Sequence, residues 1–349
     1  MSWQGTRVAV AGGAGFIGGR LVDRLIQKGA IVTVVDNLSK SNVRHLYHVL
    51  AKHGLTVRGD LLDGEAWAGP HRLLLRDLAD PEHAAEAVSR QEVVFHLAAT
   101  IGGRGYIDTH PADCCASLAI NQNVIHQAHL AGVRHVHYAS TACVYPVDLQ
   151  ATYGSDYLLK EEDAFKGGWA NCDREYGWAK FMGEITLQAY HKQYGLEGSV
   201  CRYVTAYGPW ENDTHAIIAL IKKAVERRDP YVIWGTGEQD RDFTYVDDIA
   251  EGSICAAEAI TDGSPINLGT AARYKLKDVA RLVLELCGWT PREIVYDTTK
   301  PEGVASRALD ISRARGQLGW SPQFTLRDGL RRTIEWYVST RPEPVETLE

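Results

Sequence analysis

Residues 8–18 read Val-Ala-Val-Ala-Gly-Gly-Ala-Gly-Phe-Ile-Gly, and this stretch decides the fold of the chain. Its first residues form a short apolar run, which predicts a parallel strand buried on both faces. Gly12 then allows a sharp turn from strand to helix, Gly15 lets a pyrophosphate approach the backbone, and Gly18 lets the helix pack closely on the strand. Free N–H groups at the start of that helix face an anion. The stretch therefore predicts a dinucleotide site.

The next residues extend this prediction to the identity of the dinucleotide. A helix is expected over residues 16–28 and a second strand over residues 31–35, followed by Asp36. An acid about 20 residues past the turn accepts hydrogen bonds from a ribose 2′-hydroxyl and repels a 2′-phosphate. Asp36 therefore favours NAD over NADP. The alternative is that Asp36 caps a helix.

Composition excludes several other classes of protein. The chain has 349 residues, 45% of them hydrophobic, which suffices for one large domain or two closely joined ones. Its net charge of −7 offers no basic field for nucleic acid or for an anionic membrane, and no apolar run approaches the ~20 residues of a membrane span. We expect a cytoplasmic protein. The seven cysteines lack a C-x-x-C pair, so neither a disulfide framework nor a metal site is indicated.

Strands and helices alternate through the first two thirds of the chain. Apolar strands are expected at residues 73–75, 92–97 and 133–139, and helices at 80–88, 112–131 and 174–194. This alternation predicts an α/β fold, a doubly wound parallel sheet of the Rossmann type. Residues 54–70 are irregular and are expected to form a surface excursion. Residues 102–105 are expected to form a flexible glycine loop.

The pattern becomes less regular after residue 204, which predicts a smaller, mixed C-terminal lobe for the substrate. We assign residues 1–204 and 238–270 to the NAD-binding domain. Residues 205–237 and 271–340 are assigned to the substrate lobe, and residues 341–349 to a disordered tail.

Tyr176 and Lys180 lie one helical turn apart on the same face of the helix predicted at 174–194. A nearby ammonium favours phenolate, so we expect Lys180 to lower the pKa of Tyr176 towards neutrality and also to hold a ribose hydroxyl. Thr141 adds a hydroxyl at the carboxyl end of the fifth expected strand, the edge at which ligands bind in open parallel sheets. The three residues together predict acid–base chemistry.

Further motifs follow one another along nearly the whole chain. They are Asp36-Asn37, His96-Leu-Ala-Ala99, Asn123, Ser140-Thr-Ala-Cys-Val-Tyr145, Tyr176 with Lys180, Arg202-Tyr203, Tyr207-Gly-Pro209, Arg241-Asp-Phe-Thr-Tyr-Val-Asp-Asp248 and Asn267-Leu-Gly269. With the glycine turn, this order resembles the extended short-chain dehydrogenase/reductase family, the NAD-dependent nucleotide-sugar epimerases and dehydratases.

The resemblance implies a hydride exchanged between a sugar carbon and tightly held NAD. Tyr176 would be the proton shuttle, Thr141 would polarise the oxygen and Lys180 would tune the tyrosine. It also implies a nucleotide-diphosphate sugar as substrate and a homodimer formed through the two long helices, with contacts such as Ala128, Ala131, Met182 and Leu187. The expected cofactor contacts are Gly12, Gly15, Phe16, Ile17, Gly18, Asp36, Asn37, Asp77, Leu78, Leu97, Ala98, Ala99, Asn123, Tyr176 and Lys180.

Within the family, the Ser140–Tyr145 motif is most similar to the GDP-mannose 3,5-epimerases and secondarily to the GDP-fucose synthases, which carry a cysteine at the position of Cys143. The 4,6-dehydratases carry Asp-Glu there instead. A thiol can remove a proton from carbon next to a ketone, as inversion at C3 or C5 requires. His215 matches the histidine that returns the proton in GDP-fucose synthases, whereas the 3,5-epimerases use a lysine. The alternatives are a buried apolar role for Cys143 and a solvent-facing helix start for His215.

The expected substrate contacts are Gly103, Arg104, Thr205, Trp234, Arg241 and Arg307. Arg241 and Arg307 look like the diphosphate clamp of the family, although either also fits a surface salt bridge. Trp234 can stack on a base or be a core aromatic. Thr205 departs from the asparagine that is usual in the family, which leaves the substrate pose open.

The leading hypothesis is an NAD-dependent nucleotide-sugar epimerase that oxidises C4 transiently and inverts C3, C5 or both with Cys143 and His215. Alternatives are a simple 4-epimerase with a passive Cys143, an epimerase/reductase like the GDP-fucose synthases, and a non-catalytic NAD-bound binding module. Asp36 argues against net reduction, because a reductase usually draws on NADPH.

Overall fold

The computed structural model of the protein describes residues 2–41, 43–166 and 172–340. The prediction for residues 341–349 lies outside these ranges.

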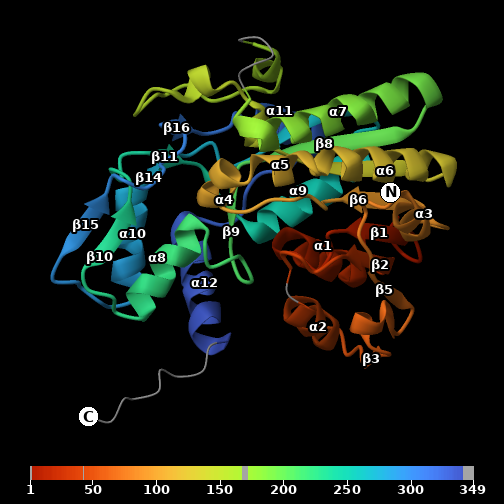
Figure 1. Cartoon of the computed structure of the whole chain (residues 1–349), viewed down its shortest axis with the longest axis horizontal. Coiled ribbons are helices and arrows are strands. Elements are labelled where there is room, and N and C mark those ends of the chain that lie inside the picture. The colour runs from red at the N-terminus through yellow and green to blue at the C-terminus, as the bar shows by residue number, and fades with distance from the viewer. Residues whose placement is uncertain (1, 42, 167–171, 341–349) are drawn as a thin grey trace.

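A parallel sheet forms the centre of the molecule (Figure 1). In the described residues its parallel strands follow the order β13-β8-β7-β6-β1-β2-β5. Their bounds are β1 (Arg7–Ala11), β2 (Ile31–Asp36), β5 (His71–Leu75), β6 (Val93–His96), β7 (His135–Thr141), β8 (Glu197–Tyr203) and β13 (Asp262–Leu268). The chain starts at the middle strand, winds outward one way, returns and winds outward the other way. This order is that of a doubly wound fold, so the predicted fold class is confirmed.

Helices cover both faces of the sheet (Figure 1). One face carries α1 (Phe16–Gln27), α2 (Val43–Lys52) and α9 (Val246–Ala259), and the other carries α3 (Pro81–Val88), α6 (Ser117–Leu130) and α7 (Arg174–Tyr194). Strand β1 shows the reason, because Val8 and Val10 belong to the core on the α1 side while Ala9 and Ala11 belong to the core on the α6 side. Successive residues of a strand point to opposite faces, so a strand between two helical layers must be apolar throughout.

The expected surface excursion at residues 54–70 extends the sheet instead. Strand β4 (Glu65–Ala68) pairs antiparallel with β5, and β3 (Val57–Arg58) pairs antiparallel with β4, with the 3-10 turn η1 (Leu61–Asp63) between them. Ala66 and Ala68 are buried in the α1-side core. The prediction was wrong because strands of two and four residues between turn signals leave almost no alternating pattern to detect.

Two further expectations near the pocket need correction. The expected glycine loop at residues 102–105 runs directly into a short helix, α4 (Arg104–Thr109). The long helix expected at 112–131 is divided at Ala116 into α5 (Pro111–Cys115) and α6. Its apolar periodicity continues across the break, so the sequence pattern gives no sign of it.

A second lobe lies beside the sheet, with α8, α10 and α12 grouped away from α1 and α3 (Figure 1). Its helices are α8 (Ala216–Val225), α10 (Leu276–Leu286) and α12 (Leu326–Thr340), and α11 (Ser312–Leu318) packs on α9. Its short strands pair as β9 (Thr205–Tyr207) with β12 (Phe243–Tyr245), β10 (Tyr231–Trp234) with β15 (Ile294–Asp297), and β11 (Asp240–Arg241) with both β14 (Tyr274–Lys275) and β16 (Ser306–Arg307). These mixed sheets form the smaller C-terminal lobe that the sequence predicts. The boundaries between the domains stay a prediction.

The homodimer also stays a prediction. Helices α6 and α7 lie side by side, and Leu130 and Tyr194 near their ends are more than half exposed. Ala128 and Leu187 are fully buried inside the single chain, so neither can contact a partner as expected. In the ranges that the structure covers, no helix is long and apolar enough to cross a membrane.

Candidate active site

A pocket of about 560 Å³ lies at the carboxyl ends of the central strands. The glycine turn, Asp36, the segment 97–102 and the Tyr176/Lys180 pair line it, and so does the segment 210–215 from the second lobe, apart from Thr214. All the expected cofactor contacts except Asn123 are among the lining residues. Asn123 instead donates from Nδ2 to the carbonyl oxygens of Leu78 and Ala79, at 3.2 and 2.9 Å.

The glycine turn is too tight for side chains at two of its positions. Gly12 has φ +80°, and a Cβ there would lie 2.9 Å from the backbone nitrogen of Ala98. A Cβ on Gly18 would overlap the carbonyl oxygen of Gly12. Helix α1 begins after Gly15 without a side-chain cap, which leaves N–H groups of its first turn available to phosphate oxygens. The turn therefore fits a dinucleotide diphosphate.

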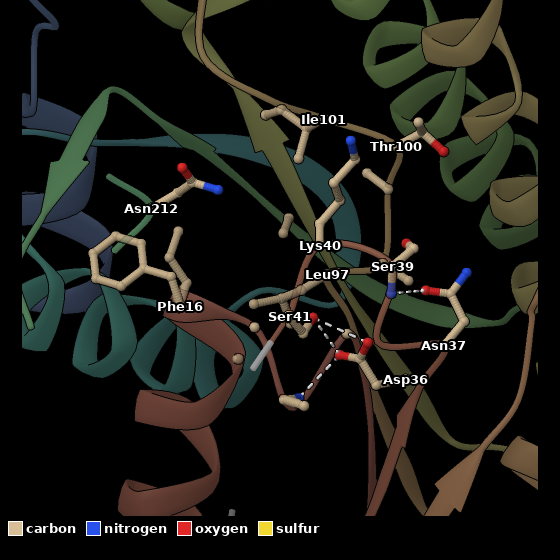
Figure 2. Close-up of a pocket in the computed structure, with 18 of the residues that line it drawn as sticks. Phe16, Asp36, Asn37, Ser39, Lys40, Ser41, Leu97, Thr100, Ile101 and Asn212 are labelled. Atoms are coloured by element: carbon tan, nitrogen blue, oxygen red, sulfur yellow. Dashed lines mark hydrogen bonds between the residues drawn. The ribbon is translucent and has the colours of Figure 1, made fainter. Parts of the chain in front are cut away.

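Asp36 is buried at the end of β2 and holds the turn in place (Figure 2). Its carboxylate accepts hydrogen bonds from the N–H groups of Ala14 and Leu38, at 3.0 and 2.9 Å, and from the hydroxyl of Ser41 at 3.0 Å. Burial outweighs these bonds and raises the pKa of Asp36. The nearby pocket cation Arg76 is bound to Glu86, 2.6 Å away. A 2′-phosphate would therefore bring a second negative charge next to the buried carboxylate of Asp36. A 2′-hydroxyl would instead find a hydrogen-bond acceptor there.

Tyr176 and Lys180 both reach the pocket from α7. Burial raises the pKa of the Tyr176 phenol, and the nearby Thr141 lowers it only in part. This shift is opposite to the one expected from the sequence. Lys180 donates to the carbonyl oxygen of Ala139, 2.8 Å away, and burial lowers its own pKa to about 7. Desolvation thus dominates the pKa of both groups.

Cys143 lies in η2 (Ala142–Val144), the 3-10 turn that follows β7, beside the phenol. The hydroxyl of Thr141 accepts the N–H of Cys143 at 3.2 Å, and the carbonyl oxygen of Cys143 accepts the N–H of Asp173 at 2.9 Å. The half-buried thiol packs in an apolar cluster with Tyr176, Ile107 and Cys114. A Cβ on Gly177 would overlap the carbonyl oxygen of Cys143. Glycine therefore lets α7 approach this turn closely.

A buried carboxylate connects the thiol to two arginines. Asp173 binds Nη1 of Arg104 and Nη2 of Arg307, each at 2.7 Å, and the second guanidinium places its Nη1 3.3 Å from the sulphur of Cys143. Burial disfavours the carboxylate, but the two arginines outweigh it and lower the pKa of Asp173 to about 2. The thiol therefore has a cation as its hydrogen-bond donor. Sequence reasoning missed Asp173, because its partners lie 69 and 134 residues away.

His215 precedes α8 and faces the same pocket from the second lobe. Its Nδ1 lies 2.9 Å from Oε1 of Glu211, and a Cβ on Gly103 would lie 3.2 Å from its Cδ2. Burial opposes the imidazolium, but the carboxylate of Glu211 outweighs it and raises the pKa of His215. The structure thus brings His215, Tyr176 and Lys180 to one pocket. Glu211 was not predicted.

Four motif residues to which the sequence assigns no role meet behind the pocket. Arg202 is fully buried and makes a two-point ion pair with Glu184, at 3.0 and 2.7 Å. It also donates to the hydroxyl of Tyr145 at 3.2 Å, which in turn donates to Asn267 at 2.5 Å. Ser140 bonds to the same Glu184. This network ties together β7, β8, β13 and α7, and two of these elements, β7 and α7, carry Thr141 and Tyr176.

Arg241 and Arg307 face each other in register on β11 and β16. Burial and the charge of Arg307 lower the pKa of Arg241 to about 10, and Arg241 donates to the carbonyl oxygens of Asp240 and Glu302. Two neighbouring cations with this mutual repulsion would gain from an anion between them. Thr205 begins β9, and Trp234 is 43% exposed with Nζ of Lys300 5.7 Å from its ring.

Fold and pocket together define the class, an α/β protein that binds a dinucleotide beside a tyrosine and a lysine. The sequence model of the NAD-dependent epimerase/dehydratase family matches residues 8–269, and the chain belongs to that family. Its cofactor is therefore NAD, which confirms the prediction from the glycine turn and Asp36.

Known proteins similar to the chain include enzymes with different substrates. The chain is 28% identical to GDP-mannose 3,5-epimerase 1 of Oryza sativa subsp. indica over 341 residues, which cover 95% of this chain and 81% of that protein. It is 30% identical to GDP-L-fucose synthase 1 of Arabidopsis thaliana over 273 residues, covering 75% and 82%. Among solved structures, UDP-glucose 4-epimerase of Thermotoga maritima with UDP-glucose matches with a TM-score of 0.81 at 26% identity, covering 96% of this chain and 99% of that one.

Proposed function

We propose that the protein is an NAD-dependent nucleotide-sugar epimerase that oxidises C4 transiently and inverts C3, C5 or both. The observation that carries the proposal is the position of Cys143, whose thiol packs beside Tyr176 and lies 3.3 Å from the guanidinium of Arg307. A thiol with only a packing role would need no cation. The similarity to a GDP-mannose 3,5-epimerase and a GDP-L-fucose synthase agrees with this assignment.

Separate residues would bind the cofactor and transfer the proton of the substrate hydroxyl. Gly12, Gly15 and Asp36 would hold NAD, which supplies reversible hydride transfer at a carbinol carbon when bound. Tyr176, with Thr141 nearby, would take the proton of the corresponding hydroxyl and give it back. Lys180 is the nearby group whose charge can stabilise a phenolate, and burial lowers its pKa to about 7.

Inversion at carbon needs two further groups. A carbonyl at C4 acidifies the hydrogens at C3 and C5, so a base can remove one of them to form an enediol. Cys143 would remove the proton while Arg307 stabilises the thiolate, and His215 would return a proton to the opposite face. Arg241 and Arg307 would also bind the diphosphate of a nucleotide sugar, because guanidinium groups bind phosphate oxygens at two points.

Solvent exchange tests this assignment directly. In deuterium oxide, with a nucleotide sugar that binds, we expect deuterium at C3 or C5 of the recovered sugar, seen by mass spectrometry and NMR. Cys143→Ala should abolish the exchange, whereas Cys115→Ala, which removes an exposed thiol from α5, should leave it unchanged. Exchange that survives Cys143→Ala would exclude the cysteine mechanism.

The match to a UDP-glucose 4-epimerase structure supports a second candidate, a simple 4-epimerase in which Cys143 is passive. In that case only C4 would invert and no solvent deuterium would enter the sugar. A thermal-shift panel of GDP-, UDP-, ADP- and dTDP-sugars identifies the nucleotide first, since a bound ligand raises the melting temperature. If no sugar binds but NAD does, the chain is a non-catalytic binding module.

A further inference from the structure

The second lobe contributes a buried acid to the pocket. Glu211 lies in the segment between β9 and α8, and its side chain is only 3% exposed. One carboxylate oxygen is bound to Nδ1 of His215, and within the described residues the other, Oε2, is buried without a hydrogen-bond partner. Because a buried carboxylate is costly unless it is paired, His215 must supply most of its compensation.

His215 also receives an opposing influence from its own helix. It is the residue that precedes α8, and the N-terminal end of a helix disfavours a positive charge. The effect of the helix end falls off with exposure to solvent, whereas a carboxylate oxygen of Glu211 lies 2.9 Å from Nδ1, although burial raises the pKa of Glu211 itself. The carboxylate therefore dominates.

Two other charged groups near the imidazole, Asp213 and Arg104, have ion-pair partners of their own. Asp213, in the same loop, lies 3.3 Å from Lys222 of α8. Arg104, which follows the Gly103 segment packed on the opposite edge of the ring, is bound by Asp108 and Asp173. Lys40, Tyr176 and Lys180 line the same pocket.

We propose that Glu211 is the positioning residue of His215: it binds Nδ1, so that Nε2 faces the substrate as a proton donor. The inference rests on the proposed function and gives the acid–base pair a direction. Cys143 takes the proton, so that a C–H bond breaks and an S–H bond forms. His215 gives one, so that its Nε2–H bond breaks and a C–H bond forms on the other face. Solvent then returns a proton to the imidazole and removes one from the thiol.

The groups that contact Cys143 and His215 decide which of the two acts as the acid and which as the base. Glu211 beside His215 favours an imidazolium, which can act as an acid, and this leaves Cys143, with Nη1 of Arg307 3.3 Å from its sulphur, as the base. Burial opposes the imidazolium, yet the carboxylate still raises the pKa of His215. A neutral histidine with an unprotonated Nε2 would make the opposite assignment equally good.

Titration of His215 tests the dyad without relying on activity. In protein labelled at its histidine rings, the His215 signal is the one lost in His215→Asn. Glu211→Gln should lower the pH midpoint of that signal by at least one unit, a tenfold change in the ratio of imidazolium to imidazole. Asp213→Asn is the matched control and should leave the midpoint within a few tenths of a unit. An equal midpoint in Glu211→Gln and the wild type overturns the proposal.

The pH profile of solvent exchange provides the second readout. With His215 as the acid, the alkaline limb follows its midpoint, so Glu211→Gln should lose about tenfold of the exchange rate at pH 8 and little at pH 6. Glu211→Asp should recover part of the loss, and its melting temperature shows whether the loop still folds. A loss that is equal at both pH values would mark Glu211 as merely structural. Absence of exchange in the wild type would refute the proposed function, while the NMR midpoints would still decide the dyad.

Discussion

Asp173→Asn tests whether the ion pairs of Asp173 with Arg104 and Arg307 hold together the site around the Cys143 thiol. The buried carboxylate of Asp173 is held by Arg104 and Arg307, and its pKa falls from the ordinary 3.8 to about 2. At 1.36 kcal/mol for each pKa unit, the difference is worth roughly 2–3 kcal/mol of folding free energy. The amide leaves Arg307 without its carboxylate and Arg104 with Asp108 alone, and breaking a buried pair costs about 3–5 kcal/mol. We therefore expect a loss of roughly 2–4 kcal/mol at pH 7.

The sign of the pH dependence follows from the lowered pKa. The contribution of Asp173 is fully present above pH 4 and disappears as the pH falls through 2, so the gap between wild type and variant should close in that window. Urea unfolding, followed by both circular dichroism and tryptophan fluorescence, measures it. The control Asp278→Asn removes an exposed acid, 2.9 Å from Arg281, and should change stability by less than about 0.5 kcal/mol.

A second readout connects stability to the site. If Asp173 holds Arg307 against Cys143, its removal should change the rate at which iodoacetamide alkylates that thiol at least threefold, as measured by peptide mass spectrometry. The reasoning fails if Asp173→Asn matches Asp278→Asn in both stability and alkylation rate.

Three further outcomes are expected. Gly18→Ala should abolish co-purification of NAD and destabilise the protein by roughly 1–3 kcal/mol, since its Cβ overlaps a carbonyl oxygen. The control Gly316→Ala, which adds a Cβ to open space in α11, should stabilise the protein by about 0.5–1 kcal/mol. Equal melting temperatures of the two variants would contradict this. Lys180→Met should lose solvent exchange yet be at least as stable as the wild type at pH 7, because burial lowers the pKa of Lys180 in the folded chain to about 7 while the unfolded chain keeps the proton to about 10.4. The stability of the wild type should accordingly rise from pH 7 to 10. A melting temperature that does not change over this pH range would refute the shift. Asp36→Ser should raise the affinity for NADP relative to NAD by at least tenfold in fluorescence titrations, because it removes a carboxylate that repels the 2′-phosphate, and an unchanged ratio would leave another residue in control of the choice.

The sequence could predict the fold because its information is local. The glycine turn, the apolar strands and the spacing to Asp36 each lie within about 30 residues, and they determine the centre of the doubly wound sheet. The strands β3 and β4 escaped prediction because they are short, and their place at the sheet edge is set by pairing with β5. Tertiary contact decides such elements, not the alternation of residues.

The site was predictable to the extent that its residues belong to motifs. Tyr176 and Lys180 lie one turn apart, and His215 was found by resemblance. Asp173, which precedes α7, binds Arg104 of α4 and Arg307 of β16, and no local sequence pattern predicts such contacts. Glu211 and His215 are spaced as on a helix, but they lie in the loop before α8, where that spacing carries no meaning by itself.

The pKa values show a different limit. The spacing of Tyr176 and Lys180 suggested a lowered phenol pKa, because charge attraction can be inferred from neighbours in sequence. Burial cannot be inferred in this way, and here it raises the pKa of the phenol and lowers that of the lysine. Distances along a helix therefore predict which groups meet but not which protonation state they hold.

The close approach of Gly177 to residue 143 makes the packing of α7 independent of the side chain at position 143. The atoms that meet there belong to the main chain of Cys143, and the main chain is shared by all amino acids. The reactive group can thus be exchanged for an acid, a hydroxyl or a methyl group without opening the joint between turn and helix, whereas a side chain at 177 would force the two apart. A scaffold built in this way can acquire a new reaction by one substitution and keep its shape.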